Sequence, residues 1–568
     1  MNELYLKWCE KAVEDSDLTA ELKAIEQNDD AINDAFYRDL EFGTAGLRGV
    51  IGAGTNRMNI YTVRLASCGL ASYVNSKTDS GSVAIAYDSR IKSDLFAKTA
   101  AEVFAAAGIK VLIYPELMPT PMLSYAVRHL KCDAGVVVTA SHNPAKYNGY
   151  KAYGSDGCQL GPDEAKQVYD VMTKTDIFGG IEHINFEDGL KSGIISYIGK
   201  ETVEDYLSDT LKSRVCPDED LSGLKVIYTP LHGTGNKPVR AILDKIGVKQ
   251  VTVVPEQELP NGNFPTCPYP NPEIRQAFEC ALALAEDIKP DLLLATDPDC
   301  DRVGIAIPSG GGYRLMTGNE VGALLLNFVL DRRKENGTLP AHPLAVKTIV
   351  STELCARIAE EYGCELVNVL TGFKYIGEQI GILEEKGEES RYVFGFEESY
   401  GYLAGTAVRD KDAVVASMLI CEMTAFYKAH GASLTDVLEQ LYRRYGYYRN
   451  VQKSFTCEGQ SGMKKIADTM ERLRSEGISE LDGSAVIKVN DYQTSVSRSM
   501  PDGKETRITL PRSNVLSYFT ADGSSLIVRP SGTEPKIKLY IGAVGETAES
   551  AEKKSAALEE SGIKLLGF

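Results

Sequence analysis

Short apolar stretches alternate with stretches of helical spacing through most of the chain. The apolar stretches have the length and β-branched content of buried strands: V-A-I-A-Y-D-S-R (83–90), K-V-L-I-Y-P (110–115), A-G-V-V-V-T-A-S-H (134–142), L-K-V-I-Y-T-P (224–230), Q-V-T-V-V-P (250–255), D-L-L-L-A-T-D (291–297), L-A-V-K-T-I-V (344–350) and Y-V-F-G-F (392–396). Helical spacing is found at 94–107, 163–175, 272–287, 318–335 and 411–430. This alternation predicts α/β domains with mainly parallel sheets.

The pattern changes after about residue 440. A single helical stretch (461–476) is followed by strand-like segments joined by short polar turns: V-I-K-V-N-D-Y (486–492), T-R-I-T-L-P (506–511), S-L-I-V-R-P (525–530) and K-I-K-L-Y-I-G (536–542). Such a run predicts an antiparallel sheet with helices on one face, and therefore an α+β domain.

The length of the chain requires several domains, because 568 residues exceed what one hydrophobic core supports. We place the boundaries where the composition turns polar between periodic stretches. The expected domains are 1–205, 206–320, 321–440 and 441–568. The Pro-rich segment P-N-G-N-F-P-T-C-P-Y-P-N-P (260–272) interrupts the second of them and is expected to be an irregular loop.

Composition excludes several classes of partner. The net charge of −18 argues against nucleic acid and anionic membranes, which both need a basic face. The longest apolar run, 321–330, is too short for a membrane helix, and the first residues lack the apolar core of a signal peptide. Twelve cysteines are scattered without zinc-type spacing, as in reduced proteins. We therefore expect a cytoplasmic protein. Its oligomeric state stays open between a monomer and a homodimer.

Residues 139–144 read T-A-S-H-N-P and follow a strand-like run. This places Ser141 at the C-terminal edge of a strand, where open parallel sheets bind their ligands. A hydrolase triad is disfavoured, since no G-x-S-x-G elbow is present and neighbouring side chains on an extended backbone point to opposite faces. His142 is thus expected to be poorly placed to deprotonate Ser141. From these residues alone, a functional serine and a simple strand-to-turn junction both stay open.

Three aspartates follow the strand-like segment at 291–297, in D-P-D-C-D-R (297–302). On an extended backbone Asp297, Asp299 and Asp301 would share one face about 6.6 Å apart, and neighbours would repel by roughly 2.5 kcal/mol at a dielectric of about 20. A hard divalent cation would relieve this repulsion, and carboxylate ligands favour Mg²⁺ over zinc. A solvated acidic turn is the plain alternative. In a second functional interpretation Asp297 is itself the nucleophile of a D-x-D phosphatase.

Two segments have the chemistry of anion sites. R-P-S-G-T-E-P-K (529–536) combines the guanidinium of Arg529 with hydroxyls and approachable backbone at Ser531, Gly532 and Thr533. G-T-A-G-L-R-G (43–49) surrounds Arg48 with glycines, although it matches neither a P-loop nor a dinucleotide fingerprint. A tight hairpin with a Ser-Gly turn is the plain alternative for the first segment, and by itself the segment favours it slightly.

Two further segments suit sugar and phosphate contacts. G-F-E-E-S-Y-G-Y (395–402) offers Glu397 and Ser399, whose oxygens can accept and donate hydrogen bonds with sugar hydroxyls. T-G-F-K-Y-I-G (371–377) offers Lys374. Backbone capping and a solvated position on a starting helix are the structural alternatives for these two segments.

Taken in this order, the segments resemble the α-D-phosphohexomutase superfamily. The similarity runs from G-T-A-G-L-R-G through T-A-S-H-N-P, D-P-D-C-D-R and G-F-E-E-S to R-P-S-G-T-E-P-K, and the longer forms resemble the longer phosphoglucomutase/phosphomannomutase branch. The resemblance implies four domains around a central cleft, of which three are related α/β domains with mainly parallel mixed sheets and the last is α+β.

The resemblance also implies a reaction. In this family a phosphoserine, here Ser141, gives its phosphoryl group to a sugar monophosphate, and the bisphosphate formed turns round and returns its other phosphoryl group. The expected activity is interconversion of glucose 1-phosphate and glucose 6-phosphate, with Mg²⁺ and glucose 1,6-bisphosphate as cofactors. Mannose or pentose phosphates are the alternative substrates, and an Asp-nucleophile sugar phosphatase is a more distant one.

The family roles map onto individual residues. The resemblance implies that Asp297, Asp299, Asp301 and an oxygen of phosphorylated Ser141 hold the metal. It implies that Lys151 acts as general acid or base, with a pKa lowered by Arg48 and the metal. His142 is expected to support the loop. The expected substrate contacts are Arg302, Lys374, Glu397, Ser399, Arg529, Ser531, Gly532 and Thr533. Cys300 departs from the family pattern, and strand alternation would direct it away from the metal.

Overall fold

The computed structural model describes residues 3–43, 46–457, 459–531 and 536–567. The chain divides into two compact units. The first comprises Met1–Gly318 and Ile376–His430, and the second comprises Asn319–Tyr375 and Gly431–Phe568. Among the residues described, no helix combines the length and apolar character required to cross a bilayer.

The first sheet carries the strand that ends just before Ser141. Its strand order is β1-β5-β4-β2-β3-β6. Strands β4, β2, β3 and β6 pair in parallel, whereas β5 is antiparallel to both β4 and β1. The bounds are β1 (Leu47–Val50), β2 (Ser82–Tyr87), β3 (Lys110–Ile113), β4 (Ala134–Val138), β5 (Tyr147–Gly154) and β6 (Ile195–Tyr197).

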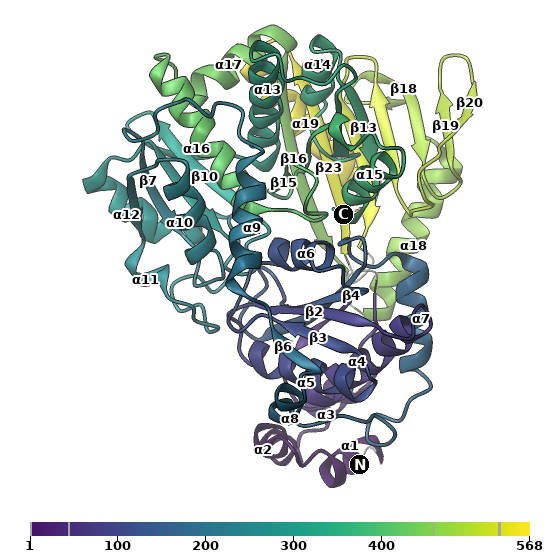
Figure 1. Cartoon of the computed structure of the whole chain (residues 1–568). Coiled ribbons are helices and arrows are strands. Elements are labelled where there is room, and N and C mark those ends of the chain that lie inside the picture. The colour runs from purple at the N-terminus through teal and green to yellow at the C-terminus, as the bar shows by residue number, and fades with distance from the viewer. Residues whose placement is uncertain (1–2, 44–45, 458, 532–535, 568) are drawn as a thin grey trace. The chain divides into compact units, whose positions relative to one another are not determined.

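Helices cover both faces of this sheet, which explains why β4 is buried along its whole length. Helices α4 (Ile60–Asn75), α5 (Ser93–Ala106) and α7 (Pro162–Met172) pack together, and α6 (Thr120–His129) packs with α9 (Lys200–Leu211). Figure 1 shows α6 above strands β2 and β3, with α4 and α5 below them. The remaining helices here are α1 (Glu3–Lys11), α2 (Ser16–Ala24), α3 (Asp29–Phe36) and α8 (Phe186–Ser192).

The second sheet ends in the aspartate-rich loop. Its order is β11-β10-β9-β7-β8, with β9, β7 and β8 parallel and β10 and β11 antiparallel. The strands are β7 (Lys225–Thr229), β8 (Gln250–Val253), β9 (Leu292–Thr296), β10 (Val303–Ser309) and β11 (Gly312–Leu315). The helices are α10 (Asn236–Lys245), α11 (Pro255–Glu258), the short 3₁₀ helix η1 (Arg275–Phe278) and α12 (Glu279–Ile288). Segment 260–272 is irregular, as predicted.

The first unit is completed by a later part of the chain. Strand β14 (Tyr392–Glu397) pairs antiparallel with β15 (Gly401–Leu403). Helix α16 (Ala413–Ala429) packs on α10 and on strands β9 and β10. Its first turn is capped by Asp412, which accepts hydrogen bonds from the N–H groups of Val414 (2.9 Å) and Val415 (3.1 Å). Also present are α15 (Lys374–Glu385) and η2 (Glu389–Arg391).

The second unit contains a parallel strand pair and the C-terminal sheet. The parallel pair is β12 (Leu344–Thr348) with β13 (Glu365–Val369). The C-terminal sheet has the order β16-β23-β22-β21-β18-β19-β20, with β17 paired to β18, and its strands are antiparallel. The bounds are β16 (Tyr447–Thr456), β17 (Glu480–Leu481), β18 (Ser484–Asp491), β19 (Val496–Ser499), β20 (Glu505–Arg507), β21 (Leu516–Thr520), β22 (Ser525–Pro530) and β23 (Lys536–Gly545).

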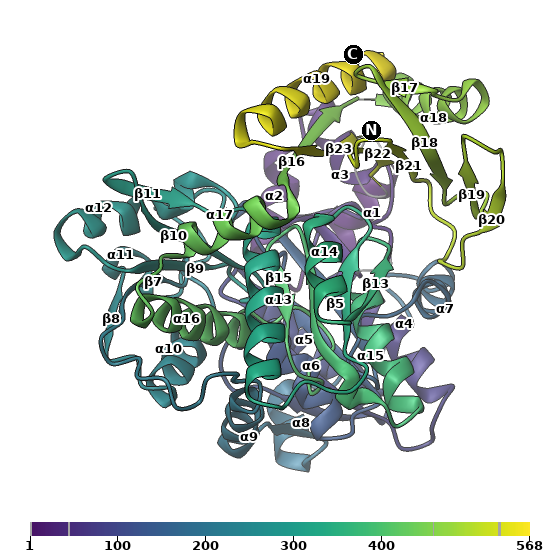
Figure 2. The same ribbon diagram turned by 90° about the horizontal axis from the view of Figure 1, so that it is seen from above.

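Two helices lie on one face of the C-terminal sheet, α18 (Gly459–Glu476) and α19 (Ala548–Leu566), as Figure 2 shows. Strand alternation produces this arrangement, since Leu526 and Val528 of β22 join the helix-facing core while Ile527 joins a cluster on the other face. The other helices are α13 (Gly318–Glu335), α14 (Leu354–Glu361) and α17 (Leu434–Tyr445). The predicted α/β sheets and α+β C-terminal region are confirmed.

The sequence analysis missed several strands, of which β5 matters most for the site. Its sequence Y-N-G-Y-K-A-Y-G lacks both apolar alternation and a continuous apolar run, yet six of its eight residues are buried. Strand β5 is held by pairing with β4 on one side and β1 on the other, so tertiary context overrides its weak strand propensity. The helix predicted at 272–287 is shorter, because 275–278 form a 3₁₀ turn and α12 begins at Glu279.

Candidate active site

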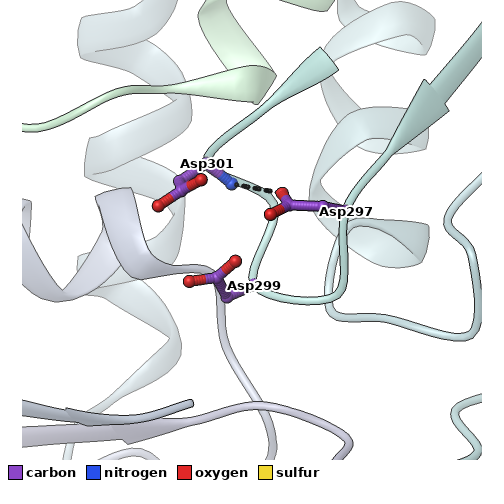
Figure 3. A group of neighbouring side chains, drawn as sticks. All are labelled: Asp297, Asp299 and Asp301. Carbon is purple, nitrogen blue, oxygen red and sulfur yellow. Dashed lines mark hydrogen bonds between the residues drawn. The ribbon is translucent and has the colours of Figure 1, made fainter. Parts of the chain in front are cut away.

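The loop between β9 and β10 brings three aspartates together. One carboxylate oxygen from each of Asp297, Asp299 and Asp301 lies within 4.8 Å of the others. Figure 3 shows the three side chains converging, with the N–H of Asp301 donating to Asp297 Oδ1 at 3.1 Å. The expectation of an extended backbone is wrong here, because the segment is a turn in which Cys300 has a φ of +53°. The turn brings the carboxylates closer together than a strand would.

The carboxylates have the donor chemistry of a divalent cation site. All three side chains are at most 1% exposed, and Oδ1 of Asp299 and Oδ1 of Asp301 are buried without a hydrogen-bond partner. Buried carboxylate oxygens are normally satisfied, so these two are available to a ligand. Three carboxylates without nitrogen or sulfur donors fit a hard cation.

Two lysines balance the charge of the carboxylates. Lys151, on β5, lies with Nζ 2.7 Å from Asp299 Oδ2 and 3.1 Å from Asp301 Oδ2. Lys411, just before α16, lies 3.2 Å from Asp301 Oδ2 and 3.1 Å from Asp410 Oδ1. The Thr120 hydroxyl also donates to Asp299 Oδ2 at 2.9 Å. The site thus combines side chains from four separate parts of the sequence.

The environment shifts the pKa values of these groups in opposite directions. Burial, and then the charges of Asp299 and Asp301, raise the pKa of Asp297 well above its usual value. Burial opposes ionisation of Asp299 too, but Lys151 and the hydrogen bonds it accepts lower its pKa. For Lys151, burial favours the neutral amine, yet the two aspartates outweigh burial and raise its pKa. The predicted lowering of the Lys151 pKa invoked the charges of Arg48 and a bound metal, and it stays a prediction for the metal-loaded site.

Ser141 lies at the same site and points at the carboxylates. It is 3% exposed, and its hydroxyl donates to Asp297 Oδ2 at 2.7 Å. Its backbone φ of +52° is in the left-handed region, which non-glycine residues rarely adopt and which is found disproportionately at functional sites. The β4 strand ends at Val138, so Ser141 follows the C-terminal end of the strand, as predicted.

His142 contacts Ser141, contrary to the sequence-based expectation. Its Nδ1 lies 3.1 Å from the Ser141 hydroxyl oxygen. The two side chains meet because Ser141 is left-handed and not extended, so the alternation rule does not apply. Burial, followed by the charges of Arg302 and Arg48, lowers the pKa of His142 well below its usual value. His142 is therefore a neutral hydrogen-bonding partner of the serine at pH 7.

The first unit also contains four further sequence-predicted residues, Arg48, Arg302, Glu397 and Ser399. Arg48 is on β1, where it pairs in register with Gly149 of β5. Arg302 follows the aspartate turn and donates to Glu273 at 2.6 Å. Glu397 is buried at the end of β14 and acts electrostatically on Arg302 and Lys411. Ser399, half-buried, lies in the turn between β14 and β15.

Other predicted residues belong to the second unit. Lys374 is half-buried at the start of α15, with its ammonium 5.1 Å from the centre of the Tyr375 ring. Arg529 is half-buried on β22, and the N–H of Ser531 donates to Lys536 O at 2.8 Å. Gly532 and Thr533 lie outside the described residues.

The sequence analysis did not identify Lys411 or Thr120. Lys411 lies in R-D-K-D (409–412) and Thr120 in M-P-T-P (118–121), and neither residue stands directly at the end of an apolar strand-like run. A run of alternating charges before an apolar helix was the available signal for Lys411. Cys300 is buried beside Gly235, and burial raises the pKa of its thiol well above the usual value, which disfavours the reactive thiolate.

The loop at 230–235 packs against the turn that carries the three aspartates. The N–H of Thr234 donates to Pro298 O at 2.8 Å, and a Cβ added at Gly233 would lie 2.4 Å from Pro298 Cα. No side chain therefore fits at position 233 without moving the turn that carries Asp297 and Asp299.

Gly233→Ala is expected to displace the aspartate turn and to destabilise the protein. Overpacking of this kind costs about 1–3 kcal/mol. Calorimetric melting should show a lower Tm than that of the wild type, and titration with Mg²⁺ should show weaker binding. Gly223→Ala is the matched control, since a Cβ there meets nothing within 4 Å. Equal Tm values and equal Mg²⁺ affinities for the two variants would contradict this packing role.

Comparison with known families covers most of the chain. Four models of the phosphoglucomutase/phosphomannomutase family match in order: the alpha/beta/alpha domains I (residues 39–177), II (204–311) and III (317–445), and the C-terminal domain (478–559). The four-domain fold class predicted from the sequence is thereby confirmed.

Individual relatives agree with the family models. The phosphoglucomutase of Staphylococcus saprophyticus is 38% identical over 515 residues, covering 90% of this chain and 92% of that protein. A Staphylococcus epidermidis phosphoglucomutase is 39% identical over 511 residues, covering 88% and 90%. A putative phosphomannomutase from Thermus thermophilus has the same fold, with a TM-score of 0.68, 22% identity and coverage of 94% of this chain and 100% of that one. The chain belongs to the phosphoglucomutase/phosphomannomutase family, whose members are mutases of the isomerase class.

Proposed function

We propose that this chain is a phosphoglucomutase that interconverts α-D-glucose 1-phosphate and glucose 6-phosphate through a phosphoserine at position 141. One observation carries the proposal: in a chain of this family, the Ser141 hydroxyl is hydrogen-bonded to Asp297 within the buried carboxylate group. Glucose is the substrate we favour because the curated relatives at 37–39% identity are phosphoglucomutases.

The reaction transfers one phosphoryl group at a time. The bond between Ser141 Oγ and phosphorus breaks as a hydroxyl oxygen of the bound hexose monophosphate attacks, which forms glucose 1,6-bisphosphate. The bisphosphate then presents its other phosphoryl group, which returns to Ser141 Oγ. Such transfers depend on positioning and charge neutralisation more than on covalent assistance, so no Ser-His-Asp triad is needed.

Each residue of the site has a proposed task in this scheme. The ammonium of Lys151 supplies positive charge beside the reacting oxygens and donates a proton to the serine oxygen as that oxygen leaves. The neutral amine then takes up the proton of the sugar hydroxyl that has attacked. Neutral His142 orients the Ser141 hydroxyl, and Arg48 and Arg302 supply cationic charge near it. Glu397 and Ser399 are the proposed contacts to sugar hydroxyls. The proposed contacts of the phosphate that is not transferred are Arg529, Ser531, Gly532 and Thr533, with Lys374 as a further cationic contact.

We propose Mg²⁺ as the cation of the carboxylate group, held by Asp297, Asp299 and Asp301 together with an oxygen of the phosphorylated Ser141. When bound, Mg²⁺ supplies a fixed positive charge that stabilises the phosphoryl group in transfer. We also propose glucose 1,6-bisphosphate as the activator that phosphorylates Ser141. The two buried carboxylate oxygens that accept no hydrogen bond support this assignment.

The domain limits, location and assembly are part of the proposal. We propose domains at 1–205, 206–320, 321–440 and 441–568, named in order for the phosphoserine, metal, sugar and phosphate loops. Twelve free cysteines support a reducing location, and we propose the cytoplasm. A monomer and a homodimer are both compatible with the proposal, and analytical ultracentrifugation distinguishes them.

A coupled activity panel tests the substrate assignment. Glucose, mannose, glucosamine and ribose 1-phosphates are supplied with Mg²⁺ and trace hexose 1,6-bisphosphate, and we expect the highest kcat/KM for glucose 1-phosphate. A higher value for mannose or ribose 1-phosphate would instead make the protein a phosphomannomutase or a phosphopentomutase. These sugars differ at few positions, so the ranking depends on a few contacts.

The sugar phosphatase alternative is disfavoured by the surroundings of Asp297. Its Oδ1 accepts hydrogen bonds from the N–H groups of Asp301 (3.1 Å) and Arg302 (3.0 Å), and its Oδ2 accepts from Ser141. Both oxygens are therefore engaged, which lowers the nucleophilicity of this carboxylate. Net release of inorganic phosphate from glucose 1-phosphate at the rate of isomerisation would restore the phosphatase interpretation.

Arg529→Ala is expected mainly to raise KM for glucose 1-phosphate. Loss of one charge-assisted phosphate contact costs about 1.5–3 kcal/mol, which corresponds to roughly a 10- to 100-fold change. Steady-state kinetics at saturating Mg²⁺ give the two parameters separately. Arg507→Ala is the control, because Arg507 is exposed on β20 of the same sheet. A large fall in kcat with unchanged KM would contradict the assignment of Arg529 to the phosphate that is not transferred.

A further inference from the structure

A buried arginine holds the loop that carries Ser141. Arg90, in the Y-D-S-R segment that leads out of β2, is 3% exposed. Its Nη1 donates to the carbonyl oxygens of Pro144 and Tyr147, both at 3.0 Å, and its Nη2 donates to those of Ser141 and Asn143. One guanidinium group thus binds four carbonyl oxygens within seven consecutive residues.

A buried aspartate connects this arginine to the other side of the loop. Asp88 Oδ2 lies 3.3 Å from Arg90 Nε and accepts the hydroxyl of Thr139 at 2.6 Å. The Thr139 hydroxyl oxygen in turn accepts the N–H of Ser141 at 2.8 Å. Asp88 Oδ1 is engaged as well, by the Ser93 hydroxyl at 2.8 Å and by the N–H of Arg90 at 2.9 Å.

These contacts hold both polar groups of the Ser141 backbone. Its N–H is bound by Thr139 and its carbonyl oxygen by Arg90. Ser141 is left-handed, a conformation that a non-glycine residue keeps only where the surroundings impose it. The same conformation aims its hydroxyl at Asp297 and brings it next to His142.

The Pro-rich segment 260–272 covers the arginine. The ring of Phe264, which is fully buried, lies 5.0 Å from Arg90 Cζ in a cation–π contact. The backbone of Gly262 packs on the chain beside Arg90, since a Cβ there would lie 2.5 Å from Ile91 N. A segment that the sequence presented only as a loop thus shields the Arg90 guanidinium from water.

We propose that Asp88, Arg90 and Thr139 form a positioning network that sets the direction of the Ser141 hydroxyl, with Phe264 as its cover. None of the three side chains contacts a reacting atom, so their effect is exerted through the loop backbone. The proposal rests on the proposed function of Ser141 as the phosphoryl carrier.

The Thr139 hydroxyl provides the cleanest test, because serine keeps it and valine keeps only the branched shape. A misplacement of about 1 Å in a reacting group costs roughly 100-fold in rate. We therefore expect Thr139→Val to lower kcat about 100-fold with KM for glucose 1-phosphate within about threefold of the wild type. Thr139→Ser is expected to retain kcat within about fivefold.

The second readout is the rate at which glucose 1,6-bisphosphate phosphorylates Ser141, followed by intact-protein mass on dephosphorylated enzyme. Thr139→Val should be slowed in parallel with its kcat, and Thr139→Ser should not. The proposed network would be refuted if Ser141 were phosphorylated at equal rates in Thr139→Val and the wild type. Equally slow phosphorylation of the valine and serine variants would refute it too. If the wild type itself gains no phosphoryl group at Ser141, the proposed function fails instead.

Arg90→Lys tests the guanidinium independently. Lysine keeps the charge but concentrates its donors on one atom, which cannot reach four carbonyl oxygens. We expect Arg90→Lys to lower kcat at least about tenfold with KM nearly unchanged. In Arg90→Ala, added methylguanidinium should restore part of the lost kcat. Arg64→Lys is the matched control, since Arg64 is a similarly buried arginine paired with Glu14 away from the loop. Wild-type kcat in folded Arg90→Lys would refute the proposal.

Discussion

Ser141→Ala is expected to abolish isomerisation of glucose 1-phosphate and to remove the phosphoryl group that we expect on the wild type. The loss should reach about 10⁴-fold or more in kcat, because removing the oxygen that carries the transferred phosphoryl group eliminates the whole pathway. The fold should survive, since the substitution removes one oxygen at a site supported mainly through its backbone. Coupled kinetics and intact-protein mass measure the two effects on the same samples.

The control for this variant is Ser155→Ala, which changes an exposed serine in the turn after β5. It should keep both the activity and the phosphoryl mass. Isomerisation at the wild-type rate by Ser141→Ala would refute the proposed role of the serine, and a phosphoryl mass retained in that variant would place the group on another residue.

Asp299→Asn is expected to produce the second largest loss. Asparagine preserves the size of the side chain and an oxygen for the Thr120 hydroxyl, but it removes one negative charge from the cation site. We expect kcat to fall about 10²- to 10³-fold, the range found when one preorganised electrostatic group is removed from an active site. The affinity for Mg²⁺ should fall at least about tenfold, since it follows the number of charged ligands.

Isothermal titration with Mg²⁺ or Mn²⁺ gives the cation affinity without reference to activity. Asp287→Asn, an exposed aspartate at the end of α12, is the control for the loss of one negative charge and should bind Mg²⁺ normally. Unchanged cation affinity in Asp299→Asn would show that the cation binds elsewhere. Unchanged kcat would show that Asp299 is not required for the chemistry.

Asp299→Asn also alters Lys151 in a measurable direction. Asp299 is the largest of the carboxylate charges that keep the Lys151 ammonium protonated against burial. Without it the pKa of Lys151 should fall, and a basic limb in the pH dependence of kcat should move to lower pH. This shift separates an electrostatic effect on Lys151 from simple loss of the cation.

Apolar patterning was enough to predict the parallel strands and the site loops that follow them. Strands β4 and β9 read as apolar runs because both of their faces are covered, and Ser141 and Asp297 follow them at the polar edge of their sheets. Sequence order alone therefore placed these two residues at the ends of strands, whereas their proposed roles came from the family resemblance. Strand β5 was not recognisable in this way, since it carries Asn148 and Lys151 and is held in place by its neighbours.

The direction of each side chain was decided by folding. Local sequence suggested that His142 pointed away from Ser141 and that the three aspartates were evenly spaced along a strand. Both expectations were wrong, because Ser141 and Cys300 adopt left-handed backbone conformations. Such conformations are unfavourable for an isolated peptide and are imposed by distant groups, among them Arg90 and the loop at 230–235. The meeting of Lys411 with Asp301, across more than a hundred residues, likewise depends on the packing of α16 against β9 and β10. Residue types and their order set which chemistry is available, whereas long-range packing set the distances at which that chemistry operates.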